Sequence, residues 1–218
     1  MTRILLINPN SSEATTAQMT TIARAVAPPG VEIVCATARR APPMILTTAE
    51  LAAAEREVVA MGLDGARDAD GIIIGAFGDP GLAALHARVG IPVVGIAEAA
   101  MLEAAAGGRR FGVATTTPAL VDYIAVRARE MGVGDLYTGI RLTEGEPIEL
   151  VADPPRLVEA LAAAVRLAIE NDGAEAVAIG GGPLGNAAAV LAGRFATPII
   201  APISAAMHRL LQEMQRAK

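Results

Sequence analysis

The sequence contains no tryptophan, three phenylalanines and two tyrosines in 218 residues. A chain with so few aromatic rings is poorly suited to a site built on stacking, so we expect a small polar ligand. Cys35 is the only cysteine. An intramolecular disulfide is therefore excluded, and so is a metal cluster held by thiolates.

Long runs of one kind of residue are also missing. The formal net charge is −5 and no run of Lys or Arg exceeds two residues, which argues against nucleic acid as a partner. No apolar stretch reaches the roughly 20 residues that a membrane helix needs. Only Met-Thr-Arg precedes the first apolar run, which is too short for a signal peptide. We therefore expect a cytoplasmic protein that does not bind membranes.

The two histidines, His86 and His208, stand alone within helical patterns. There is no H-E-x-x-H sequence and no cluster of acidic residues at the spacing of metal ligands. We therefore interpret both histidines as helix-surface residues and predict no metal site.

What the sequence does contain is an internal repeat. Residues 71–96 and 175–203 each run from an apolar segment through a Gly, a Pro-containing loop and an Ala/Leu-rich helix to a second apolar segment that opens on Pro. The Gly and the final Pro are Gly75 and Pro92 in the first copy, and Gly180 and Pro198 in the second. Upstream, Asn8 lies 67 residues before the first Gly and Thr115 lies 65 residues before the second. Such matched spacing predicts two similar halves.

Continuous apolar runs bounded by turn residues predict strands buried on both faces, as in parallel sheets. They lie near 3–8, 31–36, 71–75, 93–97, 110–115, 138–142, 176–180 and 198–202. Helical patterns alternate with them over 13–26, 48–63, 81–88, 98–106, 118–131, 154–171, 186–194 and 203–216. Ser11 or Ser12 is expected to cap the first helix, and Thr47 or Thr48, with Glu50 as capping-box partner, the second.

This alternation predicts an α/β fold with right-handed crossovers. We expect two pseudo-symmetric lobes, each a four-stranded parallel sheet flanked by helices, with the active site in the cleft between them. The predicted first lobe spans 1–106, with the C-terminal helix 203–218 packing back on it, and the second spans 107–202. The Gly-Gly-Arg-Arg segment at 107–110 is the expected crossing point.

Polar or glycine-rich loops follow four of the predicted strands: Asn8–Ser12, Ala76–Gly81, Thr115–Pro118 and Gly181–Asn186. Ligands of open parallel sheets lie beyond the carboxyl ends of the strands, so we expect these loops to share one site. Each precedes a predicted helix, whose free N–H groups and dipole favour negative charge. Such a site suits a carboxylate or an imide-like ring, and it would stabilise an enolate.

The residues that form these loops resemble the aspartate/glutamate racemase superfamily, in its hydantoin/allantoin racemase branch. The resemblance covers essentially the whole chain. It is carried by INPNSS at 7–12, FGDPGL at 77–82, PVVGIAEAAM at 92–101, TTTP at 115–118 and the glycine loop at 180–185.

The resemblance implies a cofactor-independent enzyme of two lobes, commonly oligomeric, that acts on a small molecule. It also implies two cysteines, one per lobe, which exchange protons on opposite faces of a stereocentre. Ala76 and Gly181 occupy those two positions here. Both follow the strand-ending Gly of their repeat copy, which supports the alignment. Cys35 lies within a predicted strand, away from all four loops, and we interpret it as a small buried residue.

Asp79 and Glu98 are the candidate catalytic acid/base residues, and both lie in the first half. Each has an alternative structural role. Asp79 precedes Pro80 and is a candidate N-cap of the helix at 80–88. Glu98 is a candidate first-turn acid favoured by the helix dipole. The loops of the second half offer no ionisable residue.

The candidate substrate-binding residues combine side-chain donors, apolar wall and backbone that a ligand can approach closely. Each polar member has an alternative role in turns or helix caps, and Ile45 in a plain loop. They are Asn8, Asn10, Ser11, Ile45, Ala76, Phe77, Gly78, Thr115, Thr116, Thr117, Gly181, Gly182, Pro183 and Leu184.

We therefore predict an isomerase of the racemase type, acting without a cofactor at a carbon next to a carbonyl. Its ligand would be a small carboxylate or a cyclic ureide, and we expect a homo-oligomer. Acids on one lobe only leave open a lyase or hydrolase, such as a decarboxylase or a ring-opening enzyme. A non-catalytic homologue that binds a small ligand is a third alternative, and an inactive variant lacking both cysteines is a fourth.

Overall fold

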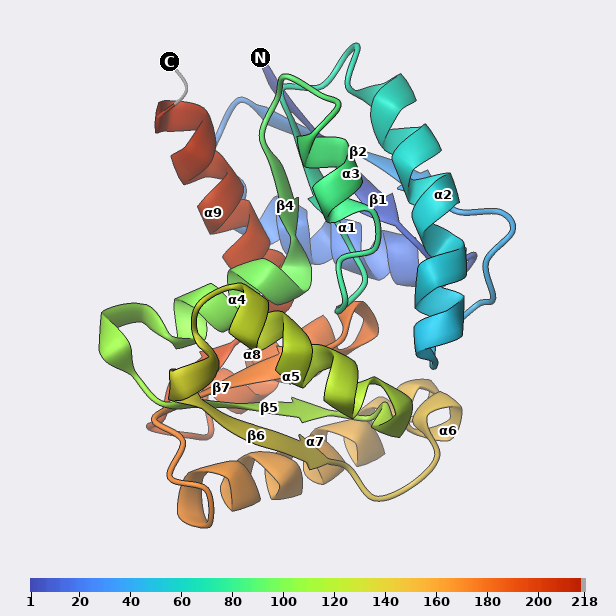
Figure 1. Ribbon diagram of the computed structural model, residues 1–218. Helices are drawn as coiled ribbons and strands as arrows, with labels where there is room; N and C mark the ends of the chain where they lie inside the picture. Colours follow the sequence, from blue (N-terminus) through green and yellow to red (C-terminus); the bar gives the residue numbers. More distant parts are fainter. Residues whose placement is uncertain (217–218) are drawn as a thin grey trace.

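A computed structural model describes residues 1–216 as an α/β protein with two four-stranded sheets (Figure 1). Neighbouring strands run parallel throughout both sheets. The strand orders are β2-β1-β3-β4 and β6-β5-β7-β8, so the second sheet repeats the arrangement of the first. The predicted fold class, with two sheets flanked by helices, is confirmed.

The first sheet, in the upper half of Figure 1, begins at the N-terminus. Its strands are β1 (Thr2–Asn8), β2 (Val31–Thr37), β3 (Gly71–Ile74) and β4 (Val93–Gly95), and the helices between and after them are α1 (Glu13–Val26), α2 (Thr48–Gly65), α3 (Leu82–His86) and α4 (Ile96–Ala104). The Ser12 side chain caps α1, and Thr47 forms a capping box with Glu50 at α2. Both helices therefore begin where these polar residues predict.

The second sheet lies below the first in Figure 1. Its strands are β5 (Phe111–Thr115), β6 (Tyr137–Leu142), β7 (Ala176–Gly180) and β8 (Ile199–Ile200), with helices α5 (Val121–Glu130), α6 (Pro147–Ala152), α7 (Pro154–Glu170), α8 (Gly185–Ala192) and α9 (Pro202–Arg216). Single 3-10 turns occur at η1 (Ala106–Gly108), η2 (Pro118–Leu120), η3 (Gly134–Leu136) and η4 (Gly182–Leu184).

Helices α4 and α9 join the two sheets. Helix α9 packs on α1, α4, β3 and β4, although it follows the last strand of the second sheet. Helix α4 also contacts β7 and β8. Their apolar side chains belong to one buried cluster that includes Leu6 of β1, Phe111 of β5 and Met207 of α9. Burying an aliphatic or aromatic side chain contributes about 1.5–3 kcal/mol, so this shared core holds the two sheets in a defined relation.

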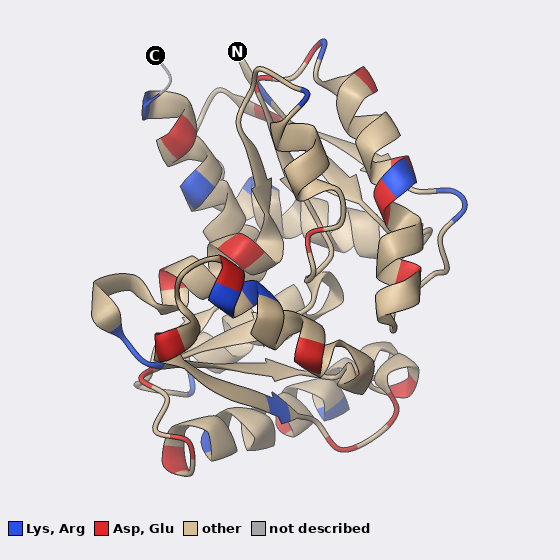
Figure 2. Ribbon diagram, in the orientation of Figure 1, with Lys and Arg blue, Asp and Glu red and all other residues tan. Residues whose placement is uncertain are grey.

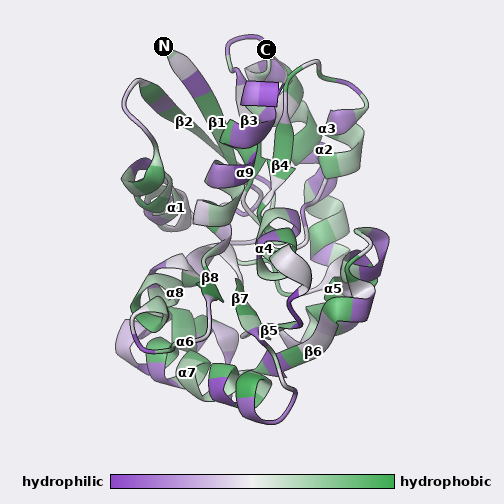
Figure 3. Cartoon of the chain, turned by 90° about the vertical axis from the view of Figure 1, so that its left-hand side faces the viewer, coloured by the Kyte–Doolittle hydropathy of each residue, from purple (hydrophilic) through white to green (hydrophobic). Residues whose placement is uncertain are grey.

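The strands of both sheets are largely hydrophobic, and hydrophilic residues gather on the helices and connecting loops (Figure 3). Two further apolar clusters lie away from the shared core, one within each half, and include Ile72 in the first and Ile179 in the second. Charged residues lie mainly on the helices and connecting loops (Figure 2). None of the helices in residues 1–216 combines the length and the apolar character that crossing a membrane requires.

Three local expectations were wrong. Strands β2 and β6 are only partly buried, whereas the strands at the opposite edges of the sheets, β4 and β8, are buried beneath the helices that pack on them. Helix α6 was not predicted, since its six residues are too few to show a helical period. The helix expected over 118–131 begins as a 3-10 turn and becomes α-helical at Val121.

Candidate active site

The four predicted loops meet at one small cavity between the two sheets. Its volume is about 50 Å³, and one water molecule needs roughly 10–15 Å³ on this measure, so it suits a small ligand. The lining residues come from the ends of β1, β3, β5 and β7, from the segment before α2, and from the first turns of α2, η2 and α5. They are Asn10, Met44, Ile45, Leu51, Gly75, Ala76, Phe77, Thr115, Thr116, Thr117, Leu120, Ile124, Gly180, Gly181, Gly182, Pro183 and Leu184.

The chemical character of this lining is neutral. Among the described residues that form the wall, none carries an ionisable side chain; the polar side chains are one amide, from Asn10, and three hydroxyls, from Thr115–Thr117. A ligand here meets dipoles and hydrogen-bond donors rather than charges.

Asn10 presents an amide donor to the cavity. Its Oδ1 accepts from Asn8 Nδ2 at 2.9 Å and from the Ser12 backbone N–H at 3.0 Å, which orients the amide. Its Nδ2 donates to no acceptor within residues 1–216. Asn8 lies behind it and does not line the cavity, because its own Nδ2 also donates to Ser12 O and to Thr16 Oγ1. Asn8 therefore positions Asn10.

The three threonines at the end of β5, Thr115–Thr117, divide in the same way. Thr115 Oγ1 donates to the Gly180 carbonyl at 2.6 Å and so ties β5 to the glycine loop after β7. Thr116 and Thr117 are also buried, and their hydroxyls find no hydrogen-bond partner in the described chain. These two hydroxyls are free for a ligand.

The two glycine loops approach each other at the cavity. A Cβ at Gly182 would lie 2.7 Å from the Gly75 carbonyl oxygen and 2.8 Å from Met19 Sδ, so only glycine allows this contact. The backbone N–H groups of Ala76, Phe77 and Gly182 donate to no protein acceptor in the part of the chain that is described. Unpaired N–H groups beside a buried cavity form an anion-friendly nest.

Ser11 and Gly78 lie outside the lining. The Ser11 backbone N–H donates to the Pro42 carbonyl at 3.1 Å, which holds the segment that carries Met44 and Ile45. The Gly78 carbonyl accepts from Tyr123 Oη at 2.9 Å. Eleven of the fourteen candidate substrate-binding residues line the cavity, namely Asn10, Ile45, Ala76, Phe77, Thr115, Thr116, Thr117, Gly181, Gly182, Pro183 and Leu184.

The structure does not bring Asp79 and Glu98 to this cavity. Both line a neighbouring pocket of about 470 Å³ between α2, α3 and α5. The Asp79 carboxylate accepts the backbone N–H groups of Ala97 at 2.9 Å and Glu98 at 2.8 Å, so it caps α4. The cap predicted for the helix at 80–88 was wrong in its target, since α3 begins after Gly81 without any side-chain cap.

Burial dominates the electrostatics of Asp79. Its side chain is 4% exposed, and desolvation raises the pKa of the carboxyl from 3.8 to about 7 against the lowering effect of its two backbone hydrogen bonds. The Glu98 carboxylate raises the pKa further and the Arg127 guanidinium lowers it. Asp79 also adopts φ 51°, which an Asp tolerates better than most residues.

Cysteine and histidine lie away from the cavity. Cys35 is exposed on the outer strand β2, with Sγ 2.8 Å from Thr20 Oγ1, so its expected burial was wrong. His86 and His208 are exposed on α3 and α9, as predicted. Within residues 1–216 no group of three or more His, Cys, Asp or Glu side chains could hold a metal ion.

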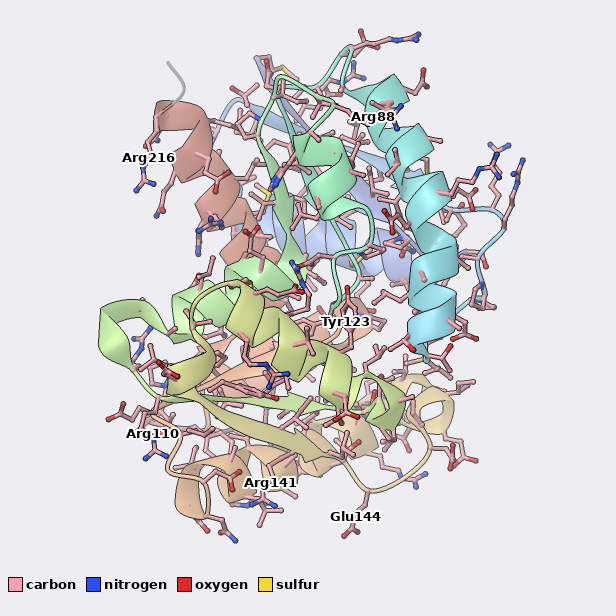
Figure 4. The ribbon with its side chains drawn as sticks, viewed as in Figure 1. Arg88, Arg110, Tyr123, Arg141, Glu144 and Arg216 are labelled. Carbon is pink, nitrogen blue, oxygen red and sulfur yellow. The ribbon has the colours of Figure 1, made fainter. Side chains whose placement is uncertain are left out.

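Sequence reasoning missed several apolar residues of the wall. Leu120 and Ile124 stand four apart after the threonine loop, and Leu51 stands four after the Thr47 cap, so each faces the cavity from the first turns of a helix. It also missed Tyr123, which rises from α5 toward the upper lobe (Figure 4). The helical spacing was a usable signal for the apolar residues, but the tyrosine's contact depends on the packing of the two lobes.

Known proteins share this architecture. The sequence matches the model of the Asp/Glu/Hydantoin racemase family over residues 4–210. It is 30% identical to a hydantoin racemase from Paenarthrobacter aurescens, over 94% of this chain and 87% of that protein. An allantoin racemase from Klebsiella pneumoniae is 31% identical with a TM-score of 0.93, covering 99% of this chain and 89% of that one.

A second solved structure supports the same relationship. Allantoin racemase from Pseudomonas fluorescens is 28% identical with a TM-score of 0.93, over 98% of this chain and 91% of that one. The match to the family extends through all four loops that surround the cavity. The chain therefore belongs to the Asp/Glu/hydantoin racemase family.

Proposed function

We propose that the protein is a cofactor-independent isomerase that acts on a small five-membered cyclic ureide, at the carbon next to a ring carbonyl. Relatives of about 30% identity are hydantoin and allantoin racemases, which supports this class of ligand. Proton exchange at such a carbon proceeds through an enolate, so the central requirement is stabilisation of an oxyanion.

The observation that carries the proposal is the set of unpaired donors around the cavity. The N–H groups of Ala76, Phe77 and Gly182, with the amide of Asn10, are available to an oxyanion without breaking any protein hydrogen bond. Removing one preorganised donor of this kind lowers the catalytic rate about 10²- to 10³-fold. The Thr116 and Thr117 hydroxyls are further donors or acceptors for ring N–H and carbonyl groups.

The neutral lining limits the proton transfer. A balanced racemase needs one base on each face of the stereocentre, and the cavity wall offers no ionisable side chain on either. We therefore propose that hydroxide from the solvent removes the proton and water returns one, while the loops stabilise the enolate. Catalysis by binding and oxyanion stabilisation alone reaches about 10³–10⁴ over the uncatalysed reaction.

A second candidate function is binding without turnover. The neutral lining favours it, because a pocket that only holds a cyclic ureide needs donors and shape but no base. The catalytic role predicted for Asp79 and Glu98 is a competing mechanism, since both would have to act from the neighbouring pocket.

Deuterium exchange separates these possibilities. Enantiopure 5-methylhydantoin, allantoin, aspartate and glutamate would each be incubated with the protein in D₂O and followed by proton NMR and polarimetry. We expect loss of the C5 proton of the hydantoin together with loss of optical rotation. The rate should rise about tenfold per pH unit without an inflection, as solvent base requires.

Other outcomes identify other functions. An inflection near pH 7 would assign the base to Asp79, whose pKa is about 7. New product signals without exchange would indicate a lyase or hydrolase. Binding by calorimetry without exchange would establish the second candidate, and no binding of any of these compounds would refute the ligand class.

A matched pair of variants tests the site itself. Asn10→Ala removes the oriented amide donor and should reduce the exchange rate at least about tenfold. Asn171→Ala is the control, because Asn171 lies exposed at the C-terminal end of α7. This variant should exchange the C5 proton of the ligand at the wild-type rate.

We also propose that the protein forms a homo-oligomer, as expected from the apolar, Ala-rich helices of the sequence. Light scattering after size exclusion at several protein concentrations tests this, and a mass of 22.2 kDa throughout would refute it.

A further inference from the structure

Each glycine loop accepts a hydrogen bond from a side chain of the opposite lobe. Tyr123 Oη, on α5, donates to the Gly78 carbonyl at 2.9 Å. Gln18 Nε2, on α1, donates to the Pro183 carbonyl at 3.0 Å. The two bonds therefore cross the gap between the lobes in opposite directions.

The internal repeat relates these two bonds. Helices α1 and α5 each follow the first strand of the central pair in their own sheet. Gly78 and Pro183 each stand three residues after the strand-ending Gly of their copy, Gly75 and Gly180. The donors differ in chemistry, a phenol and an amide, yet they reach equivalent carbonyls.

Within residues 1–216, no other hydrogen bond joins loop 75–79 to α5 or loop 180–184 to α1. No hydrogen bond joins the two loops to each other in this part of the chain. The two loops approach each other closely at Gly182 and the Gly75 carbonyl. The spacing of the N–H groups of Ala76, Phe77 and Gly182 therefore depends on how the lobes are held together. The shared apolar core fixes the two sheets, and the two side-chain bonds act locally, on the loops themselves.

We propose that Tyr123 and Gln18 are a reciprocal pair of positioning residues, which hold each glycine loop on the opposite lobe and so set the width of the cavity. The inference rests on the proposed function for its effect on the ligand, but not for its effect on the loops. Neither side chain lines the cavity, so both act through the loops.

The environment of each donor suits this role. Tyr123 is half-buried and burial raises the pKa of its hydroxyl, so the phenol stays protonated and can donate throughout the neutral range. Gln18 is half-buried and carries no charge at any pH. Both bonds therefore persist across the range in which the ligand is tested.

The variants that test the pair are Tyr123→Phe, Gln18→Met and the double substitution. Each single change removes the donor and keeps most of the side-chain volume. A net hydrogen bond of ordinary strength corresponds to about a 3- to 10-fold change in an equilibrium constant, which is the expected loss of affinity for 5-methylhydantoin in each single variant. In the double variant the losses should be non-additive by at least about threefold, because both bonds hold the same gap.

Tyr137→Phe is the matched control. Tyr137 is the other tyrosine of the chain, and its buried hydroxyl has no hydrogen-bond partner within the described residues. Removing that hydroxyl should leave ligand affinity unchanged.

A second readout needs no ligand. Amide hydrogen exchange, followed by mass spectrometry, would be measured on peptides covering 75–82 and 180–186 of the unliganded protein. We expect each single variant to raise exchange in both peptides, because loss of one bond frees the gap for both loops, while Tyr137→Phe leaves both unchanged.

The outcomes separate the two proposals. Faster exchange in both loops with no ligand binding even by the wild type would support the positioning role and refute the proposed function. Wild-type exchange and affinity in Tyr123→Phe and Gln18→Met would overturn the positioning role while leaving the function standing. Strictly additive losses confined to the loop that was released would also overturn the pairing.

Discussion

The two glycine loops have the same backbone plan and different means of support. After β3, Asp79 turns its carboxylate onto the first N–H groups of α4. Four residues after the strand-ending Gly, the equivalent position after β7 is Leu184, which is 1% exposed. One loop is therefore anchored by a buried acid on a helix N-terminus, and the other by apolar packing.

The helices that receive these loops differ accordingly. Helix α4 begins with free N–H groups, which a carboxylate satisfies, and Gly95 before it leaves room for that carboxylate. The equivalent helix α9 begins with Pro202, which has no N–H, and it is preceded by Ala201. Both copies of the repeat therefore keep the same strand-loop-helix geometry. The first copy supports its loop with a charged or polar contact and the second with apolar packing.

The largest expected effect is at Gly95. Gly95→Ala would place a Cβ on the Asp79 carboxyl carbon, so the acid must leave its two donors, and the free energy of unfolding should fall by about 3–5 kcal/mol. Urea denaturation measures it. The control, Ala201→Gly at the equivalent position, should cost only about 0.5–1 kcal/mol. Equal losses in both variants would refute the asymmetry.

The pH dependence of stability sharpens the same comparison. The pKa of Asp79 is higher in the folded state, about 7, than its ordinary 3.8, so the native state binds more protons between those values. Its contribution to stability is fully present below about pH 4 and is lost as pH rises to about 7, by about 2–4 kcal/mol.

Asp79→Asn isolates this contribution. Near pH 4–5 the buried acid is protonated and, like an amide, presents one carbonyl acceptor, so the variant should match the wild type within about 1 kcal/mol. The amide does not titrate, so the variant should gain about 2–4 kcal/mol relative to the wild type as pH rises to about 7. Denaturant unfolding of both proteins across this range is the measurement. A difference that stays constant with pH would show that Asp79 does not titrate there.

A smaller effect is expected at Gly181. Its backbone, with φ 157° and ψ 138°, is one that residues with a Cβ rarely adopt, and a Cβ would lie 3.0 Å from Leu184 Cγ. Gly181→Ala should lower the free energy of unfolding by about 1–2 kcal/mol. The equivalent exchange in the first copy, Ala76→Gly, should change it by less than about 1 kcal/mol. An unchanged free energy of unfolding in Gly181→Ala would show that the Leu184 side chain can move aside without cost. A cysteine side chain at position 181 would then fit as well.

The smallest effect is expected at the only thiol. Cys35 is exposed on the outer strand β2 and does not line the cavity, so Cys35→Ala should change stability by no more than about 0.5 kcal/mol and leave deuterium exchange of the ligand unchanged. Alkylation of the wild type with iodoacetamide should give the same result. Loss of exchange on alkylation would place the thiol in the mechanism and contradict the proposal.

Much of the fold follows from local sequence. Apolar runs and helical periods predicted all eight strands and most helices, because an apolar run between turn residues marks a strand even where, as in β2 and β6, its burial is partial. The Thr47–Glu50 capping box could also be predicted, because its two partners lie within one turn of the chain. The repeat placed the four loops together because parallel strands end at one edge of each sheet.

The target of the Asp79 carboxylate was not readable. A local rule favoured a cap on the next helix, but the chain turns at φ 51° and delivers the acid to α4, eighteen residues further on. The neutral lining of the cavity and the exposed position of Cys35 were likewise decided by which strand forms an edge and which loops meet.

By itself, then, the sequence determined the two-lobed α/β plan, the pairing of its copies and the loops that face the gap. Those features depend on period, spacing and turn chemistry, all of which act over a few residues. Only the tertiary structure decided that Asn10 rather than Asn8 faces the cavity, that Asp79 supports a helix from a separate pocket, and that Tyr123 and Gln18 cross between lobes. The orientation of Asn10 comes from local hydrogen bonds whose outcome the sequence pattern does not rank, whereas the contacts of Tyr123 and Gln18 join distant segments and form only once the shared apolar core has brought the lobes together.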